Sequence, residues 1–204
     1  MSHTYNVTII TLKPGTGAEA MARIKDHLAD ISGELVGYFL SDIGALNRIL
    51  LVHHAMSIEQ AISDREALAL SSDPFGCGEF MITVTSDTFL SLPFLGPIKT
   101  GHVGPVFEVR TYKIKPGGMD PTIELWRKAV PDRDKVSPLL VGFYSLSEVE
   151  PCFMQIWPYQ SLESRARLRA KAVADGVWPA PGAVAYLIEQ QADIYYAGEF
   201  SPLQ

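Results

Sequence analysis

Short motifs of this chain occur twice in the same order, and this duplication constrains the fold more than any other feature. A Lys-Pro-Gly turn at residues 13–15 returns at 115–117, and a Val-Gly-aromatic triplet at 36–38 returns at 141–143. Two further pairs follow in order, residues 56–59 with 160–163 and residues 87–89 with 193–195. Matches that keep their order and nearly constant spacing indicate one unit of about 100 residues written twice.

The repeats predict the domain organisation of the 204 residues. We expect a first repeat at residues 1–97 and a second repeat at residues 106–204. The segment between them, 98–105, belongs to a stretch rich in Gly and Pro and suits a linker. Hydrophobic residues make up 47% of the chain, which is enough for both repeats to form cores.

Each repeat shows the same order of periodic segments. An alternating β-branched run precedes the Lys-Pro-Gly turn, and then come a helical pattern, two strands, a second helix and a last strand. The expected strands lie at 5–12, 35–41, 48–55, 81–90, 106–114, 139–146, 152–159 and 184–195, with helices near 21–31, 57–70, 123–130 and 161–174. The order β-α-β-β-α-β is that of a ferredoxin-like unit in the α+β class.

A single unit of this kind covers only one face of its sheet with helices. Two tandem units can turn their uncovered faces toward each other and form an intramolecular dimeric α/β barrel. We expect a ligand in the space between the two sheets. Sheet edges left exposed after this pairing would make a further homodimer feasible.

Charge and composition exclude some classes of partner. The net charge of -6 gives no attraction for nucleic acid or an anionic membrane surface. No apolar stretch reaches the roughly 20 residues of a spanning helix, and the first residues lack the pattern of a secretory signal. We therefore expect a cytoplasmic protein. Cys77 and Cys152 are far apart and have no zinc spacing, so no metal site is expected.

Several motifs of the second repeat resemble the NIPSNAP family. They are Phe-Glu-Val-Arg-Thr-Tyr at 107–112, Lys-Pro-Gly at 115–117, Val-Gly-Phe at 141–143, Gln-Ile-Trp-Pro-Tyr at 155–159 and Phe-Ser-Pro-Leu at 200–203. The resemblance spans about 106–203, and the first repeat looks like a diverged copy. It implies the dimeric α/β-barrel fold but no firm activity, since related barrels include monooxygenases, haem-dependent enzymes and isomerases.

Polar side chains share one face of the first strand in each repeat. Alternation places Glu108, Arg110 and Tyr112 on one face, and Asn6 and Thr8 on the equivalent face of the first repeat. We expect these faces to point between the sheets, and the alternate apolar faces to contact the helices. Two interpretations remain open. Glu108 and Arg110 form a structural ion pair, or Arg110 binds an anionic or carbonyl group while Glu108 accepts a proton.

A second set of candidates lies on the third strand of each repeat. Gln155, Trp157 and Tyr159 alternate and share a face, and His53 is the counterpart of Trp157 in the first repeat. Together with Tyr112, Asn6 and Thr8 they could bind a flat apolar or aromatic ligand, with His53 as a second candidate for proton transfer. The alternative is that these aromatic rings only fill the barrel.

His53 is followed by His54, and the two point to opposite faces of a regular strand. They therefore cannot chelate one ion, but one of them could be an axial ligand of haem. An absorption spectrum with and without added haem tests that alternative. The favoured function is a small-molecule enzyme of monooxygenase or isomerase type without a cofactor, and the competing class is a non-catalytic scaffold.

Overall fold

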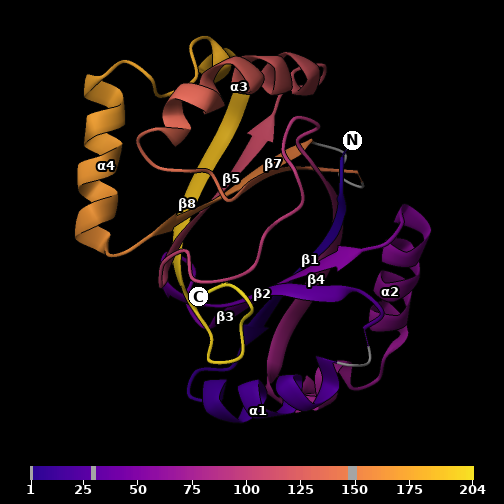
Figure 1. Cartoon of the computed structure of the whole chain (residues 1–204). Coiled ribbons are helices and arrows are strands. Elements are labelled where there is room, and N and C mark those ends of the chain that lie inside the picture. Colours follow the sequence, from indigo (N-terminus) through magenta and orange to yellow (C-terminus); the bar gives the residue numbers. More distant parts are fainter. Residues whose placement is uncertain (1, 29–30, 147–150) are drawn as a thin grey trace.

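The computed structural model describes residues 2–28, 31–146 and 151–204, which form an α+β fold (Figure 1). The first repeat contains β1 (Thr4–Leu12), α1 (Gly17–His27), β2 (Glu34–Ile43), β3 (Arg48–Ala55), α2 (Ile58–Leu70) and β4 (Met81–Ser91). The second contains β5 (Val106–Ile114), α3 (Met119–Asp134), β6 (Val141–Ser145), β7 (Cys152–Tyr159), α4 (Leu162–Ala174) and β8 (Leu187–Ala197). Short 3-10 turns, η2 (Pro74–Gly76), η3 (Gly78–Phe80) and η4 (Ala183–Tyr186), precede β4 and β8. The β-α-β-β-α-β order of both repeats is confirmed.

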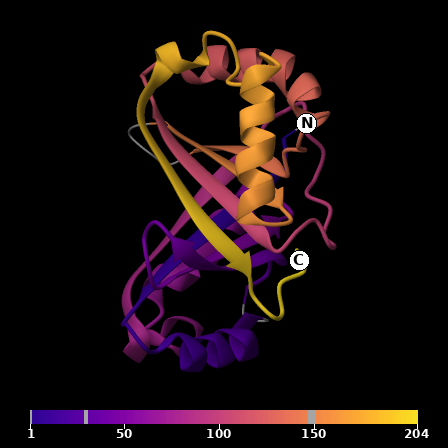
Figure 2. The same cartoon turned by 90° about the vertical axis from the view of Figure 1, so that its left-hand side faces the viewer.

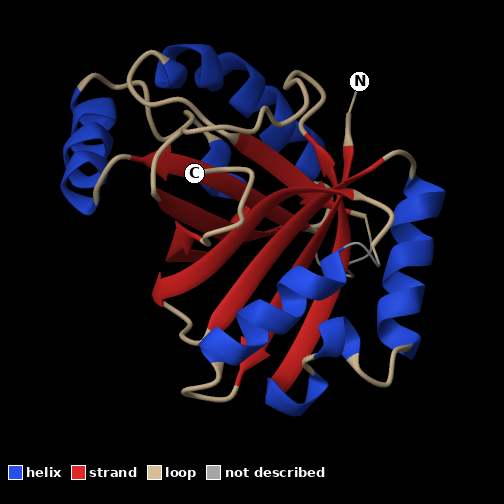
Figure 3. Cartoon of the chain, turned by 60° about the horizontal axis from the view of Figure 1, so that its bottom comes forward, coloured by secondary structure: helices blue, strands red, loops and turns tan. Residues whose placement is uncertain are grey.

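The strands form one closed antiparallel barrel in the order β1-β3-β2-β8-β5-β7-β6-β4. Each repeat contributes four neighbouring strands, and the repeats join through the β2–β8 and β4–β6 pairs. The helices lie outside the strands, with α1 and α2 on the part of the barrel built by the first repeat and α3 and α4 on the other (Figures 1 to 3). The predicted intramolecular dimeric α/β barrel is confirmed.

Closure of the barrel changes the basis of the homodimer prediction. Every strand of the barrel has a hydrogen-bonded neighbour on both sides within the described residues. The exposed sheet edges on which the sequence based a further homodimer are therefore paired inside one chain. A homodimer stays a prediction, and it would have to use another surface.

The barrel interior is apolar and is built by both repeats. Tyr5 and Val7 of β1 meet Phe107 of β5 there, and the rings of Phe39 and Phe107 lie 4.6 Å apart. The expectation that these apolar faces contact the helices is wrong. Both faces of each sheet are buried, one by the other sheet and one by helices, so alternation separates the faces without identifying the inner one. The fully enclosed face takes the apolar side chains because unpaired polar groups cost most there.

The candidate residues accordingly lie on the outer face of the barrel, beneath the helices, and the prediction that they point between the sheets is wrong. These residues are Asn6, Thr8, His53, Glu108, Arg110, Tyr112, Gln155, Trp157 and Tyr159. The barrel interior keeps a pocket of about 280 Å³ near one end. Arg48, Asp87 and Asp193 are among the residues that line it, and Asp193 accepts hydrogen bonds from the Ala45 N–H at 3.0 Å and the Gln191 side chain at 2.7 Å.

One serine caps the N-terminus of the second helix in each repeat, Ser57 before α2 and Ser161 before α4. Ser57 accepts a hydrogen bond from the Gln60 N–H at 3.1 Å, as expected for an N-cap. Ser161 accepts from the Ser164 N–H, and the Ser161 N–H donates to the Ser164 hydroxyl, both at 3.0 Å. This is a reciprocal capping box in which serine takes the place usually held by Glu or Gln.

Candidate functional site

In the second repeat, the charged side chains of β5 form an ion-pair network with arginines of α4. Glu108 is fully buried, and its carboxylate contacts Arg110 at 2.8 Å, Arg165 at 2.6 Å and Arg169 at 3.2 Å. Burial acts to raise the pKa of Glu108, but the three guanidinium groups outweigh it and lower the pKa. Glu108 is therefore ionised and fully engaged, which fits the structural interpretation of this residue.

Most of the remaining groups beside this network are paired with one another, although the Gln155 amide nitrogen has no hydrogen-bond partner among the described residues. Arg110 donates to the Tyr112 hydroxyl at 2.6 Å, and Trp157 donates its indole N–H to Gln155 at 3.2 Å. Arg165 and Arg169 of α4 both reach inward to Glu108. The space around Glu108 beneath α4 is thus occupied by the protein's own side chains.

Beside this network, aromatic rings enclose a buried arginine. Arg133 of α3 is 1% exposed, and its guanidinium carbon lies 4.5 Å from the ring centre of Trp157 and 5.9 Å from that of Trp178. It donates to the Ser137 carbonyl at 2.9 Å and approaches the Tyr159 hydroxyl at 3.5 Å. Trp157 and Arg133 fill the space between sheet and helices in this repeat.

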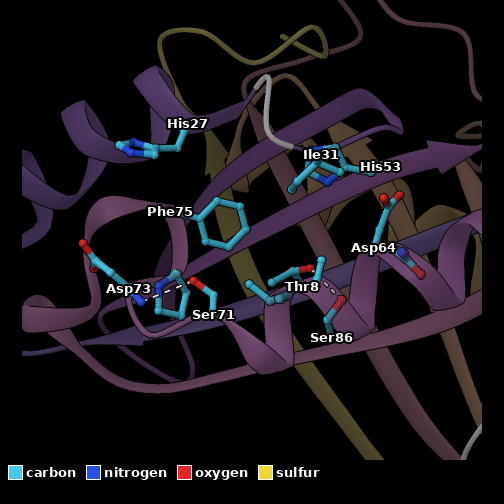
Figure 4. Close-up of a pocket in the computed structure, with 13 residues that line it drawn as sticks. Thr8, His27, Ile31, His53, Asp64, Ser71, Asp73, Phe75 and Ser86 are labelled. Carbon is cyan, nitrogen blue, oxygen red and sulfur yellow. Dashed lines mark hydrogen bonds between the residues drawn. The ribbon is translucent and has the colours of Figure 1, made fainter.

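The equivalent space of the first repeat is a pocket of about 150 Å³ between the sheet and the helices. Figure 4 shows Thr8, His53 and Ser86 along the sheet and Asp64 on α2, and Phe75 also lines the pocket. His53 stands at the position that Trp157 occupies in the second repeat, so the smaller imidazole leaves the space open. The pocket follows from the divergence of the first repeat.

His53 is the chemically distinct group in this pocket. Its side chain is 2% exposed, and its Nε2 has no hydrogen-bond partner among the described residues. Burial lowers the pKa of His53 to about 4, although the nearby Asp64 carboxylate acts to raise it. The imidazole is therefore neutral near pH 7, and in the tautomer protonated on Nδ1 it presents a lone pair at Nε2.

Asp64 supplies a second unsatisfied acceptor to the same pocket. Its Oδ1 accepts a hydrogen bond from Ser32 at 2.9 Å, whereas its buried Oδ2 has no partner in the described part of the chain. Two buried polar atoms without partners in one pocket are costly unless water or a ligand bonds to them. A ligand with two donor hydrogens, such as a diol, matches both acceptors.

Asn6 and Thr8, predicted as binding residues, have different surroundings. The Asn6 amide donates to the Ala61 carbonyl of α2 at 2.8 Å and its oxygen accepts from Thr88 at 2.9 Å, so Asn6 ties the helix to the sheet. Thr8 shares a hydrogen bond of 2.8 Å with Ser86, and both hydroxyl groups line the pocket. Thr8 is therefore better placed than Asn6 to contact a ligand.

Sequence reasoning missed Asp64, Phe75 and Ser86. The sequence does hold a signal for Asp64, because this residue lies three positions after Ala61 and so shares the inner face of α2. An acidic side chain is seldom buried, so its place on that face points to a role. Phe75 has no such signal. Its φ of 54° places a bulky residue in the left-handed region, a conformation that only the surrounding structure imposes.

Within the described ranges, no three His, Cys, Asp or Glu side chains lie together so that they could hold a metal ion. In the same residues, every helix is too short or too polar to cross a bilayer.

The closed barrel and the pocket beneath its helices define a dimeric α/β-barrel protein with both halves in one chain. Comparison with solved structures shows the same fold in an anthrone oxidase-like protein, with a TM-score of 0.65 and 14% identity. That match covers 97% of this chain and 92% of the other. At this identity the similarity shows the fold alone.

The family resemblance lies in the second repeat. The family model described as NIPSNAP matches residues 107–202, so the second repeat is similar to this family over nearly its whole length. Protein NipSnap of Drosophila melanogaster is 26% identical over 199 residues, which are 90% of this chain and 70% of that protein. The Protein NipSnap homolog of Dictyostelium discoideum is 34% identical over 73 residues, 36% of this chain and only 33% of its own length. The resemblance identified from the sequence is confirmed.

Proposed function

We propose that this chain is a small-molecule enzyme whose first repeat binds a compact ring carrying a hydroxyl or carbonyl group. The observation that carries the proposal is the buried His53 Nε2 without a partner among the described residues, in a pocket it shares with Asp64. A cavity of about 150 Å³ accommodates one benzene-sized ring. The fold shared with an anthrone oxidase-like protein also favours a ring-bearing ligand, by analogy.

The chemistry assigned to His53 is acceptance of a proton. A ligand O–H or acidic C–H gives its proton to Nε2, and the electron pair of the broken bond stays on the ligand. The nearby Asp64 carboxylate then stabilises the imidazolium, as the direction of its effect on the His53 pKa indicates. Returning the proton to another ligand atom completes an isomerisation, whereas transfer of the ligand's electrons to dioxygen starts an oxygenation.

Binding is tested first, with catechol as the probe. Catechol is titrated into the full chain while the imidazole nitrogens of His53 are followed by NMR, and toluene serves as a ring without a donor. We expect catechol to shift the His53 signals and toluene to bind at least tenfold more weakly, since one unsatisfied buried acceptor costs about 1–3 kcal/mol. His53→Leu should abolish catechol binding, and His54→Gln, on the opposite face of β3, should retain it.

Turnover is tested next, with two readouts. Oxygen uptake with catechol indicates an oxygenase, and deuterium exchange into cyclohexanone in D₂O without oxygen uptake indicates isomerase-type proton transfer. Either activity must disappear in His53→Leu. The proposal is wrong if neither catechol nor cyclohexanone binds at millimolar concentration. It is also wrong if His53→Leu binds catechol as well as the unmodified chain does. That outcome favours the non-catalytic scaffold.

A further inference from the structure

A second pocket lies in the other repeat, where the end of β7 meets the segment between the repeats. Its volume is about 630 Å³, within the range of small-molecule sites. One wall is apolar and is formed by Val136, Leu139, Leu140, Pro158 and Leu168. None of these residues lines the His53 pocket, so this site goes beyond the proposed function.

Two hydroxyl groups lie at the inner end of this pocket. Ser137 is 2% exposed, and its Oγ has no hydrogen-bond partner among the residues the structure describes. The Tyr159 oxygen accepts the weak contact from Arg133 at 3.5 Å, and the adjacent Ser137 hydroxyl acts to lower the Tyr159 pKa, so the two hydroxyls lie close together. Burial raises the pKa of Tyr159, so this hydroxyl keeps its proton. Both groups can donate to an acceptor in the pocket.

Charges of both signs surround these hydroxyls, but the Glu108 carboxylate near Tyr159 is already paired with three arginines. Arg133 lies directly behind them and forms no ion pair within the described ranges, while the neighbouring Asp134 carboxylate is bonded to the Leu139 N–H at 2.8 Å. Lys99 and Arg167 are exposed at the rim, and the described lining holds no Asp or Glu. A buried unpaired guanidinium is unfavourable, and a nearby anion offsets that cost.

We infer that this pocket binds the carboxylate of an apolar acid. The carboxylate accepts hydrogen bonds from Ser137 and Tyr159, within the field of Arg133, and the rim cations Lys99 and Arg167 attract it. The apolar chain packs against the Leu139 side of the pocket. An inorganic anion would satisfy the same donors but would leave the apolar wall uncovered, so an amphiphile fits better.

Isothermal titration of the full chain with octanoate tests this inference. Octan-1-ol serves as the probe without charge, and acetate and inorganic phosphate as probes without an apolar chain. We expect octanoate to bind at least tenfold more tightly than each of the three. Ser137→Ala should raise the Kd about fivefold, as for one lost hydrogen bond. The double variant Lys99→Ala/Arg167→Ala, which changes only exposed side chains, should raise it about tenfold.

Two variants serve as matched controls. Lys171→Ala removes a cation from the same helix as Arg167 but outside the pocket, and should leave the octanoate Kd unchanged. His53→Leu should also leave it unchanged, which separates this site from the proposed enzyme site. The inference is overturned if octanoate does not bind at millimolar concentration, or if octan-1-ol binds equally well. It is also overturned if acetate or phosphate matches octanoate, or if the Lys99/Arg167 double variant has the original Kd.

Discussion

Replacement of Glu108 by Gln tests whether this carboxylate stabilises the fold or carries out catalysis. Glu108 is fully buried and contacts Arg110, Arg165 and Arg169 at 2.6–3.2 Å. Gln keeps the shape but removes the charge, so three cations lose their counter-ion. Breaking a buried ion pair on one side costs about 3–5 kcal/mol.

The structure places the expected cost at the low end of that range. The Arg165 and Arg169 side chains are 26% and 32% exposed, so water can solvate them when the carboxylate is lost. Arg110 also keeps its bond to the Tyr112 hydroxyl. We therefore expect the free energy of unfolding to fall by about 3 kcal/mol. For a chain of this length, that corresponds to a decrease in Tm of about 6–12 °C.

Urea denaturation and calorimetry at pH 7 measure this change. Glu189→Gln is the matched control, because Glu189 pairs with Lys113 at 3.3 Å on the surface and is 65% exposed. That variant should change the free energy of unfolding by less than about 1 kcal/mol. An unfolding free energy of Glu108→Gln within 0.5 kcal/mol of the original, an order-of-magnitude threshold for surface changes, would refute the reasoning.

The same variant has a signature in acid. Because the pKa of Glu108 is lowered in the folded state, its contribution is complete above the unfolded value of about 4.3 and is lost as the pH falls through the folded pKa. Glu108→Gln should therefore lose less stability than the unmodified chain below pH 4, on the order of the contribution it lacks. Catechol binding at His53 should be unchanged in this variant, whereas a catalytic role for Glu108 predicts that it is impaired.

Three further predictions concern single positions. The pKa of His53 is about 4 in the folded state and about 6.5 in the unfolded state. Its contribution to the free energy of unfolding is therefore complete above pH 6.5 and falls by about 3 kcal/mol as the pH decreases to 4. His53→Leu should remove this loss, as measured by urea denaturation at several pH values. Gly44→Ala should cost about 1–3 kcal/mol in the same assay, because φ is +108° and a Cβ would collide with the Asp193 side chain, whereas Gly17→Ala, with open space around it, should be neutral or stabilising. Ser161→Ala should lower the free energy of unfolding by about 1 kcal/mol through loss of the cap, and an unchanged urea midpoint would contradict the role of the capping box.

Much of the fold could be predicted because its signals are local. The Lys-Pro-Gly turns, the alternating runs and the helix-capping serines act within a few residues, and β3 and β7 have the predicted bounds. The repeat then implies a barrel, because two sheets that each have one uncovered face bury the most apolar surface when those two faces pack against each other. The start of the last strand differs from the expected residue 184, because residues 183–186 form the turn η4 before β8 begins at Leu187.

The candidate site was only partly predictable. His53 and Thr8 were identified from alternation and do line a pocket, but Asp64 arrives from α2 and Phe75 from the turn before β4. Contacts between distant elements leave little trace in a single sequence. The role of Glu108 was equally open, because its two partners on α4 are more than 50 residues away in the chain.

By itself, the sequence determined the duplication, the order of elements, the barrel and the resemblance of the second repeat to the NIPSNAP family. Only the tertiary structure decided which face of each sheet became the barrel interior. Both faces are buried, and the alternation of side chains separates the two faces without showing which one is the inner face. It also decided that the second repeat fills its outer pocket with Trp157 and Arg133, while His53 leaves the first one open. The volume left between sheet and helices depends on side chains from several elements, so the size of the pocket is fixed only when those elements pack together.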